Sequence, residues 1–284
     1  MKKKKIYPAS LPVLTLAAGF VGMLLRLWLL SGVSEEGLLK AWHPAAILST
    51  ALTFGVIGFL IFHTRKFKSR GKYRINFPAS LPAALCCWLA AAALFLRGMG
   101  ILMEGGSRIH IIAGCGCIAA VPCLILTGLS RFQGKRSVFL LHVVTAAAYA
   151  LLLLLHYQSW SSSSVVHLHI YRMLALAGMM LTTIHRAEFD LRIASRRVYA
   201  PMSLCALYFC LNAIAEGDGL FFLIMALWLL TNQCALVLPR RRRSQQPAPE
   251  EAPAEPDAQA EASAPAEETP EAPESPAEPG QEEV

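Results

Sequence analysis

Long apolar runs recur along residues 1–243, and short polar stretches rich in lysine and arginine separate them. At 1.5 Å per residue of helix, runs of this length cross a hydrocarbon core of about 30 Å. The pattern predicts an all-α fold, a polytopic membrane protein with a bundle of about eight transmembrane helices. We expect the helices at about 9–31, 43–63, 79–97, 109–128, 138–157, 165–185, 200–215 and 220–238.

Basic residues alternate between the connecting segments as the positive-inside rule describes. With the N-terminus in the cytoplasm, the inside segments hold 21 of the 26 Lys and Arg residues, and the outside loops hold only Lys40, Arg97 and Arg108. The run at 200–215 is the weakest, because it is short and contains Asn212. It must still cross, since the arginines before it and after 220–238 both belong inside. We expect a multi-pass protein of the plasma membrane with both termini cytoplasmic.

Composition divides the chain into two domains. Hydrophobic residues make up 55% and charged residues only 16%, whereas a soluble domain carries about 25% charge. Residues 1–243 hold every Lys and Arg, while 244–284 hold 12 of the 19 acidic residues. We expect 1–243 to be the transmembrane domain and 244–284 to be a disordered cytoplasmic tail, because it has too few large apolar residues to offset ordering entropy. The basic residues flank apolar runs, which indicates the lipid bilayer as partner and not a nucleic acid.

Several kinds of chemistry lack support in the sequence. All seven acidic residues of 1–243 fall in predicted loops, which counts against proton-coupled carriers and intramembrane aspartyl proteases. All eight cysteines fall in predicted helices, where we interpret them as packing residues. Zinc-protease, phosphate-loop and nucleophile-elbow motifs are missing. We therefore predict no metal, no cofactor and no catalytic residue, and whether the protein is an enzyme stays open, with the balance against it.

Polar residues concentrate toward the predicted outer face. Arg26 and Arg172 each lie within a predicted helix, about 8–10 Å from its outer end. Five acidic residues in outer loops, including Glu216 and Asp218, are able to meet these cations. We predict that both arginines point into the bundle and bind an anionic small molecule or lipid headgroup. The neighbouring residues that complete this predicted site are His156, His167, His169 and Tyr171.

The same residues also fit interfacial anchoring, in which arginine reaches up to the headgroups and Trp28, Trp42 and Trp160 form an aromatic belt. Small residues near mid-membrane, among them Gly55, Gly58 and Gly178, are interpreted as helix-packing positions.

Three classes of function remain open. The first is transport or binding of a small or lipid-like solute within the bundle. The second is a non-catalytic membrane adaptor that recruits a partner through the acidic tail. The third is a membrane enzyme that acts on lipid headgroups at the outer face, with an outer histidine as the general base. A polar central cavity would favour the first class, a filled apolar core the second, and a lateral groove leading to His and Arg the third.

Overall fold

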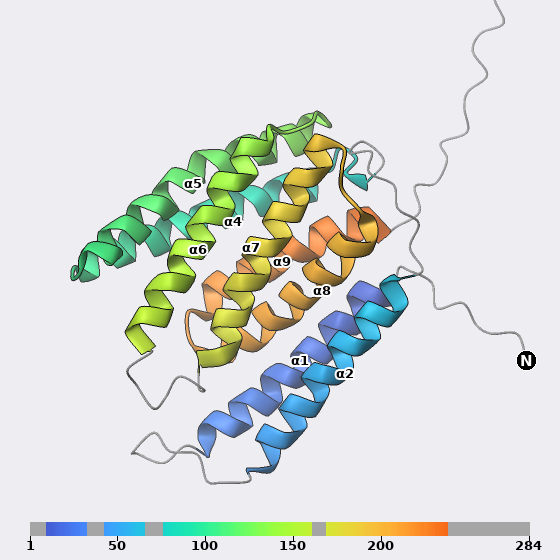
Figure 1. Ribbon diagram of the computed structural model, residues 1–284, viewed down its shortest axis with the longest axis vertical. Coiled ribbons are helices and arrows are strands. Elements are labelled where there is room, and N and C mark those ends of the chain that lie inside the picture. Colours follow the sequence, from blue (N-terminus) through green and yellow to red (C-terminus); the bar gives the residue numbers. More distant parts are fainter. Residues whose placement is uncertain (1–9, 33–42, 66–75, 161–168, 238–284) are drawn as a thin grey trace, which may run out of the picture. The chain divides into compact units, whose positions relative to one another are not determined.

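The computed structural model describes residues 10–32, 43–65, 76–160 and 169–237, and these ranges contain helices and no strand. The predicted all-α class is therefore confirmed (Figure 1). The tail prediction for 244–284 lies outside the described residues. The helices are α1 (Ser10–Ser31), α2 (Pro44–Thr64), α4 (Leu81–Glu104), α5 (Arg108–Gln133), α6 (Phe139–Trp160), α7 (Ile170–Leu191), α8 (Arg196–Ala213), the short 3-10 helix η2 (Ile214–Glu216) and α9 (Gly219–Val237).

Among the residues that the structure describes, six helical segments are long and apolar enough to cross a membrane: α1, α2, α4, α5, α6 and the stretch Arg196–Glu216. The last of these corresponds to the run that the sequence marked as weakest. Helix α9 is apolar but shorter over Gly219–Cys234, and α7 is not among the helices that are apolar enough to cross. The molecule is thus a bundle of membrane-spanning type.

Several helices extend past the end of their apolar run. Helix α4 continues through Arg97 to Glu104, and α5 continues through Arg131 to Gln133. Glycines set both ends: Gly105 and Gly134 have φ values of 65° and 68°, which side-chain-bearing residues adopt at a cost. Basic residues that the sequence placed in loops therefore belong to helices.

Six helices, α4 to α9, form a closed ring in which each contacts the next and α9 returns to α4. Large side chains fill its centre. Tyr149 and Trp228 are almost completely buried; the Tyr149 hydroxyl donates to Met225 Sδ at 3.5 Å, and the Trp228 indole N–H donates to Cys87 Sγ at 3.1 Å. The Trp228–Cys87 contact joins α9 to α4, and the filled centre is apolar.

Helix α7 turns its polar side chains toward the inside of the ring. Arg172, Thr182, Thr183, Arg186 and Asp190 are all buried. Polar groups of a membrane helix face the bundle interior because hydrocarbon cannot solvate them. These buried polar residues lower the mean hydropathy of α7 and explain why it is not recognised as a membrane span from its composition.

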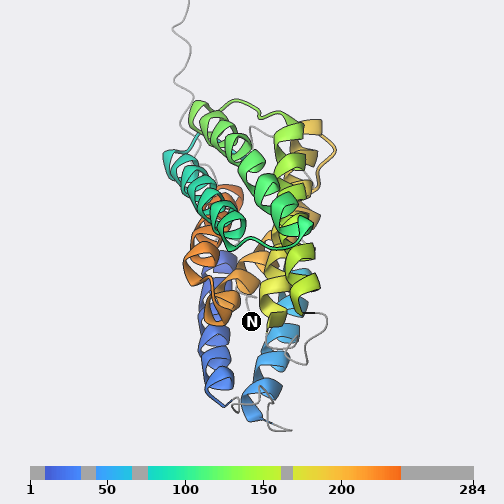
Figure 2. The same cartoon turned by 90° about the vertical axis from the view of Figure 1, so that its left-hand side faces the viewer.

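Helices α1 and α2 form a hairpin outside the ring that contacts it chiefly through α8 (Figures 1 and 2). Helix α1 fits closely, since a Cβ at Gly22 would lie 2.4 Å from the Asn212 side chain. The packing interpretation fails for Gly55 and Gly58 of α2, where an added Cβ would meet nothing within 4 Å. Gly55 instead borders an apolar groove of about 390 Å³ between α1 and α2.

Candidate functional site

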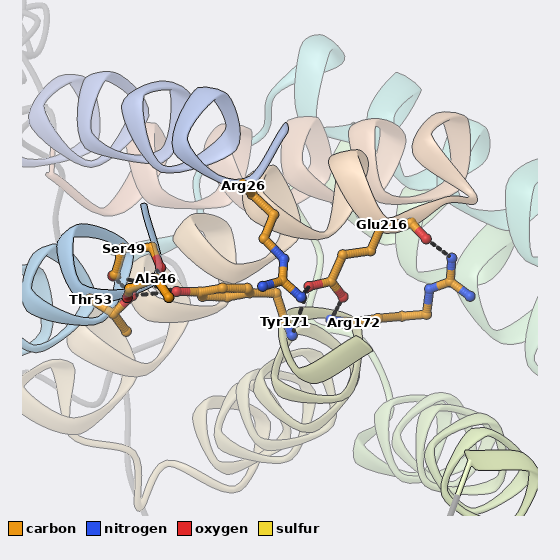
Figure 3. Close-up of polar contacts among 7 residues, drawn as sticks. All are labelled: Arg26, Ala46, Ser49, Thr53, Tyr171, Arg172 and Glu216. Carbon is orange, nitrogen blue, oxygen red and sulfur yellow. Dashed lines mark hydrogen bonds and ion pairs between the residues drawn. The ribbon is translucent and has the colours of Figure 1, made fainter. Parts of the chain in front are cut away.

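We call the two ends of the ring, after the arginines of α7, the Arg172 end and the Arg186 end. At the Arg172 end, Arg26 of α1 reaches across to η2, where its Nη2 lies 2.8 Å from Glu216 Oε1 (Figure 3). The two side chains are 4% and 0% exposed. The hairpin is therefore tied to the ring by a buried ion pair.

Glu216 also caps the first turn of α7. Its carboxylate accepts the backbone N–H of Tyr171 at 3.3 Å and of Arg172 at 2.9 Å, and its carbonyl oxygen accepts from Arg172 Nη2 at 2.7 Å (Figure 3). Free N–H groups and the helix dipole make a helix N-terminus favourable for a carboxylate. One acidic residue thus joins α1, η2 and α7.

Asp218 extends this network to α4. Its Oδ2 lies 3.2 Å from Arg97 Nη2 and 3.6 Å from Arg172 Nη1. Between the two acids, Gly217 has a φ of 111°, and a Cβ there would lie 2.4 Å from Arg172 Nη2. The turn needs glycine for its backbone conformation and for the close approach of the guanidinium.

Tyr171 connects the ion pair to α2. The Arg26 guanidinium carbon lies 5.3 Å from the Tyr171 ring centre, and the phenol contacts the Thr53 hydroxyl at 2.8 Å (Figure 3). Thr53 donates to the Ser49 carbonyl at 2.8 Å and lies 3.0 Å from the Tyr208 hydroxyl. The Thr53 hydroxyl is therefore placed to accept from both phenols, which joins α2 to α7 and α8.

An aromatic stack lies beside these ions. The Trp160 ring stacks on His156 with centroids 4.7 Å apart and on His169 with centroids 4.1 Å apart. The Arg172 guanidinium carbon lies 5.2 Å from the Trp160 ring centre. The stack bridges the end of α6 and the start of α7, where an anionic group would meet both a cation and polarisable rings.

A lateral groove of about 680 Å³ runs between α6 and α7 below this stack. Tyr157 and Ile170 border it near the stack, at the ends of their helices. Its other lining residues are Ala150, Leu153, Leu154, Met173, Leu174 and Ala177. An alkyl chain matches such a lining, and the combination of tail groove and cationic aromatic cluster matches an amphiphile.

The structure brings together most residues of the predicted site. Arg26, Arg172 and Tyr171 converge on Glu216, while His156 and His169 flank Trp160. His167 lies outside the described residues. Sequence reasoning foresaw that Glu216 and Asp218 can meet the arginines, but it did not foresee that the Glu216 side chain is fully buried.

The prediction that the acidic residues of 1–243 all lie in loops is wrong. Glu188 and Asp190 belong to the last turn of α7, and Glu104 is the final residue of α4. Asp190 is buried. Helix α7 continues past its apolar run because the inward-facing Asp190 finds partners inside the bundle, which a hydropathy pattern does not reveal.

The sequence also missed a second polar cluster at the Arg186 end. Arg131 and Arg186, assigned to loops by their charge, are each 1% exposed. Their guanidinium carbons lie 5.1 Å and 5.5 Å from the centre of the Phe77 ring. The sequence held one signal for this cluster. Thr127 and Arg131, like Thr182 and Arg186, are four residues apart, which places each pair on one helix face.

Ser137, His142 and Asp190 meet at the same end but not as a catalytic relay. Ser137 Oγ lies 3.0 Å from His142 Nε2 and donates to Asp190 Oδ2 at 2.9 Å, and Asp190 Oδ2 lies 3.2 Å from the same Nε2. A relay needs the carboxylate on the other ring nitrogen. The contact instead links the α5–α6 connection to α7.

Within the residues that the structure describes, no three His, Cys, Asp or Glu side chains are grouped to hold a metal ion. Comparison with protein-family models, with curated proteins and with solved structures finds no match for the chain.

Proposed function

We propose that the protein is a multi-pass protein of the plasma membrane whose eight helices all cross the bilayer, with both termini in the cytoplasm. Helix α7 completes the ring, and its polar residues face inward, which supports a span despite its charge. The Arg172 end is then extracytoplasmic. Fused after Arg243, a reporter that works only in the cytoplasm should be active, and one that works only outside the cytoplasm should be inactive. Activity of the second reporter would contradict this topology.

We propose further that the Arg172 end binds an anionic amphiphile, such as a phospholipid, with its headgroup at Trp160, His169 and Arg172 and its chain in the α6–α7 groove. The observation that carries this proposal is the position of the cationic aromatic stack at the end of an apolar lateral groove. Arginines 26, 97 and 172 outnumber Glu216 and Asp218 in this network, so the cluster retains a positive charge for the headgroup.

The filled centre of the ring counts against a solute path through it and leaves the adaptor and the membrane enzyme open. A solute path through the ring would have to displace Tyr149 and Trp228, which are almost completely buried and bonded to neighbouring helices. The filled core is compatible with an adaptor, which is the second candidate. The lateral groove fits a headgroup-modifying enzyme equally well, with His156 or His169 as base, but binding comes first in either case.

The test measures binding of phosphatidylglycerol with brominated acyl chains to the detergent-purified protein through quenching of tryptophan fluorescence. Trp160→Ala should weaken binding about tenfold, since a stacked aromatic beside a cation contributes on the order of 1–2 kcal/mol. Brominated phosphatidylcholine should bind more weakly than the anionic lipid.

Trp88→Ala provides a matched control. Trp88 borders another apolar groove, between α4 and α5, whose lining in the described chain consists of Trp88, Ala91, Ala92, Phe95, Val121 and Ile125 without any cation. This variant should retain the affinity for phosphatidylglycerol. Equal losses in the two variants would show that the lipid only coats apolar surface, and the proposed site would fall.

A further inference from the structure

Two threonine–arginine pairs face the interior of the ring at the Arg186 end. Thr127 and Arg131 lie one turn apart on α5, and Thr182 and Arg186 lie one turn apart on α7. All four are at most 1% exposed. Residues spaced by four share a helix face, so two helices direct a hydroxyl and a guanidinium into the same half of the ring.

An aromatic wall holds the two guanidinium groups. Arg131 and Arg186 both lie against Phe77, and Arg186 lies 5.8 Å from the Trp228 ring centre as well. Phe77 is itself fixed by Phe189 and Tyr199, whose rings meet it edge-on. Arg131 also donates from Nη1 to the Pro78 carbonyl oxygen at 3.1 Å, and the planar guanidinium is the group with which arginine binds oxyanions.

Two amide side chains of α9 carry buried polar atoms that lack a partner, although Asn232 Nδ2 donates to the Trp228 carbonyl at 2.8 Å. Both polar atoms of the Gln233 side chain are completely buried and have no hydrogen-bond partner, and neither does Asn232 Oδ1. They lie on α9 between Trp228, which Arg186 contacts, and Leu236, which packs with Phe77. A buried amide without a partner destabilises the fold, so such an amide is expected where a ligand supplies the partner.

Three hydroxyl groups on α5, α7 and α8 are buried without a partner as well. Thr127 Oγ1, Thr182 Oγ1 and Ser203 Oγ are buried and lack a partner, although a helical threonine or serine commonly bonds to the preceding turn, as Thr183 does with the Met179 carbonyl at 2.7 Å. Three hydroxyls from α5, α7 and α8 are therefore available as donors. Asp190, a buried carboxylate one turn after Arg186 on α7, accepts from Ser137 and lies 3.2 Å from His142 Nε2 through its Oδ2, while its Oδ1 has no hydrogen-bond partner.

We propose that the Arg186 end of the ring is a binding site for one small oxyanion of the phosphate or sulfate class. Arg131 and Arg186 supply the charge, the Gln233 amide and the threonine hydroxyls supply further donors, and Phe77 keeps the guanidinium planes in place. The site is separate from the groove proposed for an amphiphile and does not depend on it.

The experiment uses the full chain in detergent and measures its thermal unfolding with inorganic phosphate, against sodium chloride at equal ionic strength. Phosphate should raise Tm with saturation, and ³¹P NMR should show line broadening of phosphate in the presence of the protein. Gln233→Leu and Arg131→Gln should each raise the dissociation constant by about tenfold or more, since a hydrogen bond to a charged group contributes about 1.5–3 kcal/mol. Arg108→Gln, at the exposed opposite end of α5, should leave it unchanged.

A second arm distinguishes free phosphate from a lipid phosphate. The same unfolding measurement is made in nanodiscs of phosphatidylcholine alone and of phosphatidylcholine with phosphatidylglycerol, without inorganic phosphate. A shift that depends on phosphatidylglycerol and is lost in Gln233→Leu assigns the oxyanion to a headgroup. Identical Tm values in phosphate and chloride together with no lipid-dependent shift, or shifts that persist in both Gln233→Leu and Arg131→Gln, would overturn the proposal. The ³¹P measurement on the unmodified chain keeps the test valid if Arg131→Gln fails to fold.

Discussion

The two ends of the ring hold buried arginines of the same helix in opposite ways. Arg172 lies in the first turn of α7, where the helix dipole disfavours a cation; its guanidinium donates to the Glu216 carbonyl oxygen and lies 3.6 Å from the Asp218 carboxylate. Arg186 lies toward the C-terminal end, where the dipole favours a cation, and it lies against Phe77 and Trp228. The burial of an arginine therefore does not reveal its role, which depends on its neighbours. The ion pairs of the Arg172 end join helices, whereas polar groups near Arg186 lack partners.

The largest effect should come from breaking the ion pair at the Arg172 end. Glu216→Gln removes the counter-charge of a buried Arg26 and weakens the cap of α7, so the free energy of unfolding should fall by about 3–5 kcal/mol. The measurement is an equilibrium SDS titration in mixed micelles.

Glu188→Gln is the control for this change, because the Glu188 side chain is 31% exposed and pairs with His185 on its own helix. Its effect should stay below about 1 kcal/mol. Combining Arg26→Met with Glu216→Leu should recover much of the loss, since a pair of apolar side chains replaces a pair of charges. Similar losses in Glu216→Gln and Glu188→Gln would refute the joining role of Glu216.

A smaller loss should follow from a methyl group in the turn between the two acids. Gly217→Ala places a Cβ at a positive φ and against Arg172 Nη2, which should cost about 1–3 kcal/mol. Gly105→Ala also sits at a positive φ, but with nothing within 4 Å of the added carbon. The difference between the two variants in the same titration isolates the displacement of Arg172, and no difference would mean that the turn tolerates it.

The hydrogen bonds that join Thr53 of α2 to Tyr171 and Tyr208 should contribute less to the free energy of unfolding. Thr53→Val removes the hydroxyl that meets the phenols of Tyr171 and Tyr208, and we expect a loss of about 1–2 kcal/mol. Thr50→Val removes a hydroxyl that bonds only to the Ala46 carbonyl on an exposed face, and it should change the free energy of unfolding little. Limited proteolysis of the α2 segment should follow the same order.

The smallest effect, and one of opposite sign, is expected at the Arg186 end. Gln233→Leu replaces an amide whose polar atoms have no partner, so without an oxyanion it should be neutral or stabilise the fold by up to about 1 kcal/mol. Glu216→Leu, the comparable change at the other end, should strongly destabilise. If Gln233→Leu were also strongly destabilising, the two ends would not differ as described.

The sequence predicted the helical class, because apolar runs reflect the demand of hydrocarbon directly. Each predicted range overlaps a described α-helix, but the ends differ by up to seven residues, as at Glu104 of α4, where the prediction stopped at residue 97. The sequence also selected Arg26, Arg172 and Tyr171, since charge within an apolar run is conspicuous. It failed where a polar residue follows the end of such a run: Arg131, Arg186 and Asp190 read as loop residues by charge, yet tertiary contacts bury them. Which helices face one another, and hence the Glu216 contact, depends on packing that a single sequence does not encode locally.

The seam between α4 and α9 constrains how the protein is made. Of the six ring helices, α4 is synthesised first and α9 last, so the face of α4 that carries Cys87 stays without its partner Trp228 until α9 has been made. Contacts between distant segments form late because loop closure is costly. A nascent chain truncated before α9 therefore presents an open crescent of ring helices to the insertion machinery, in which Cys87 of α4 still lacks its partner Trp228.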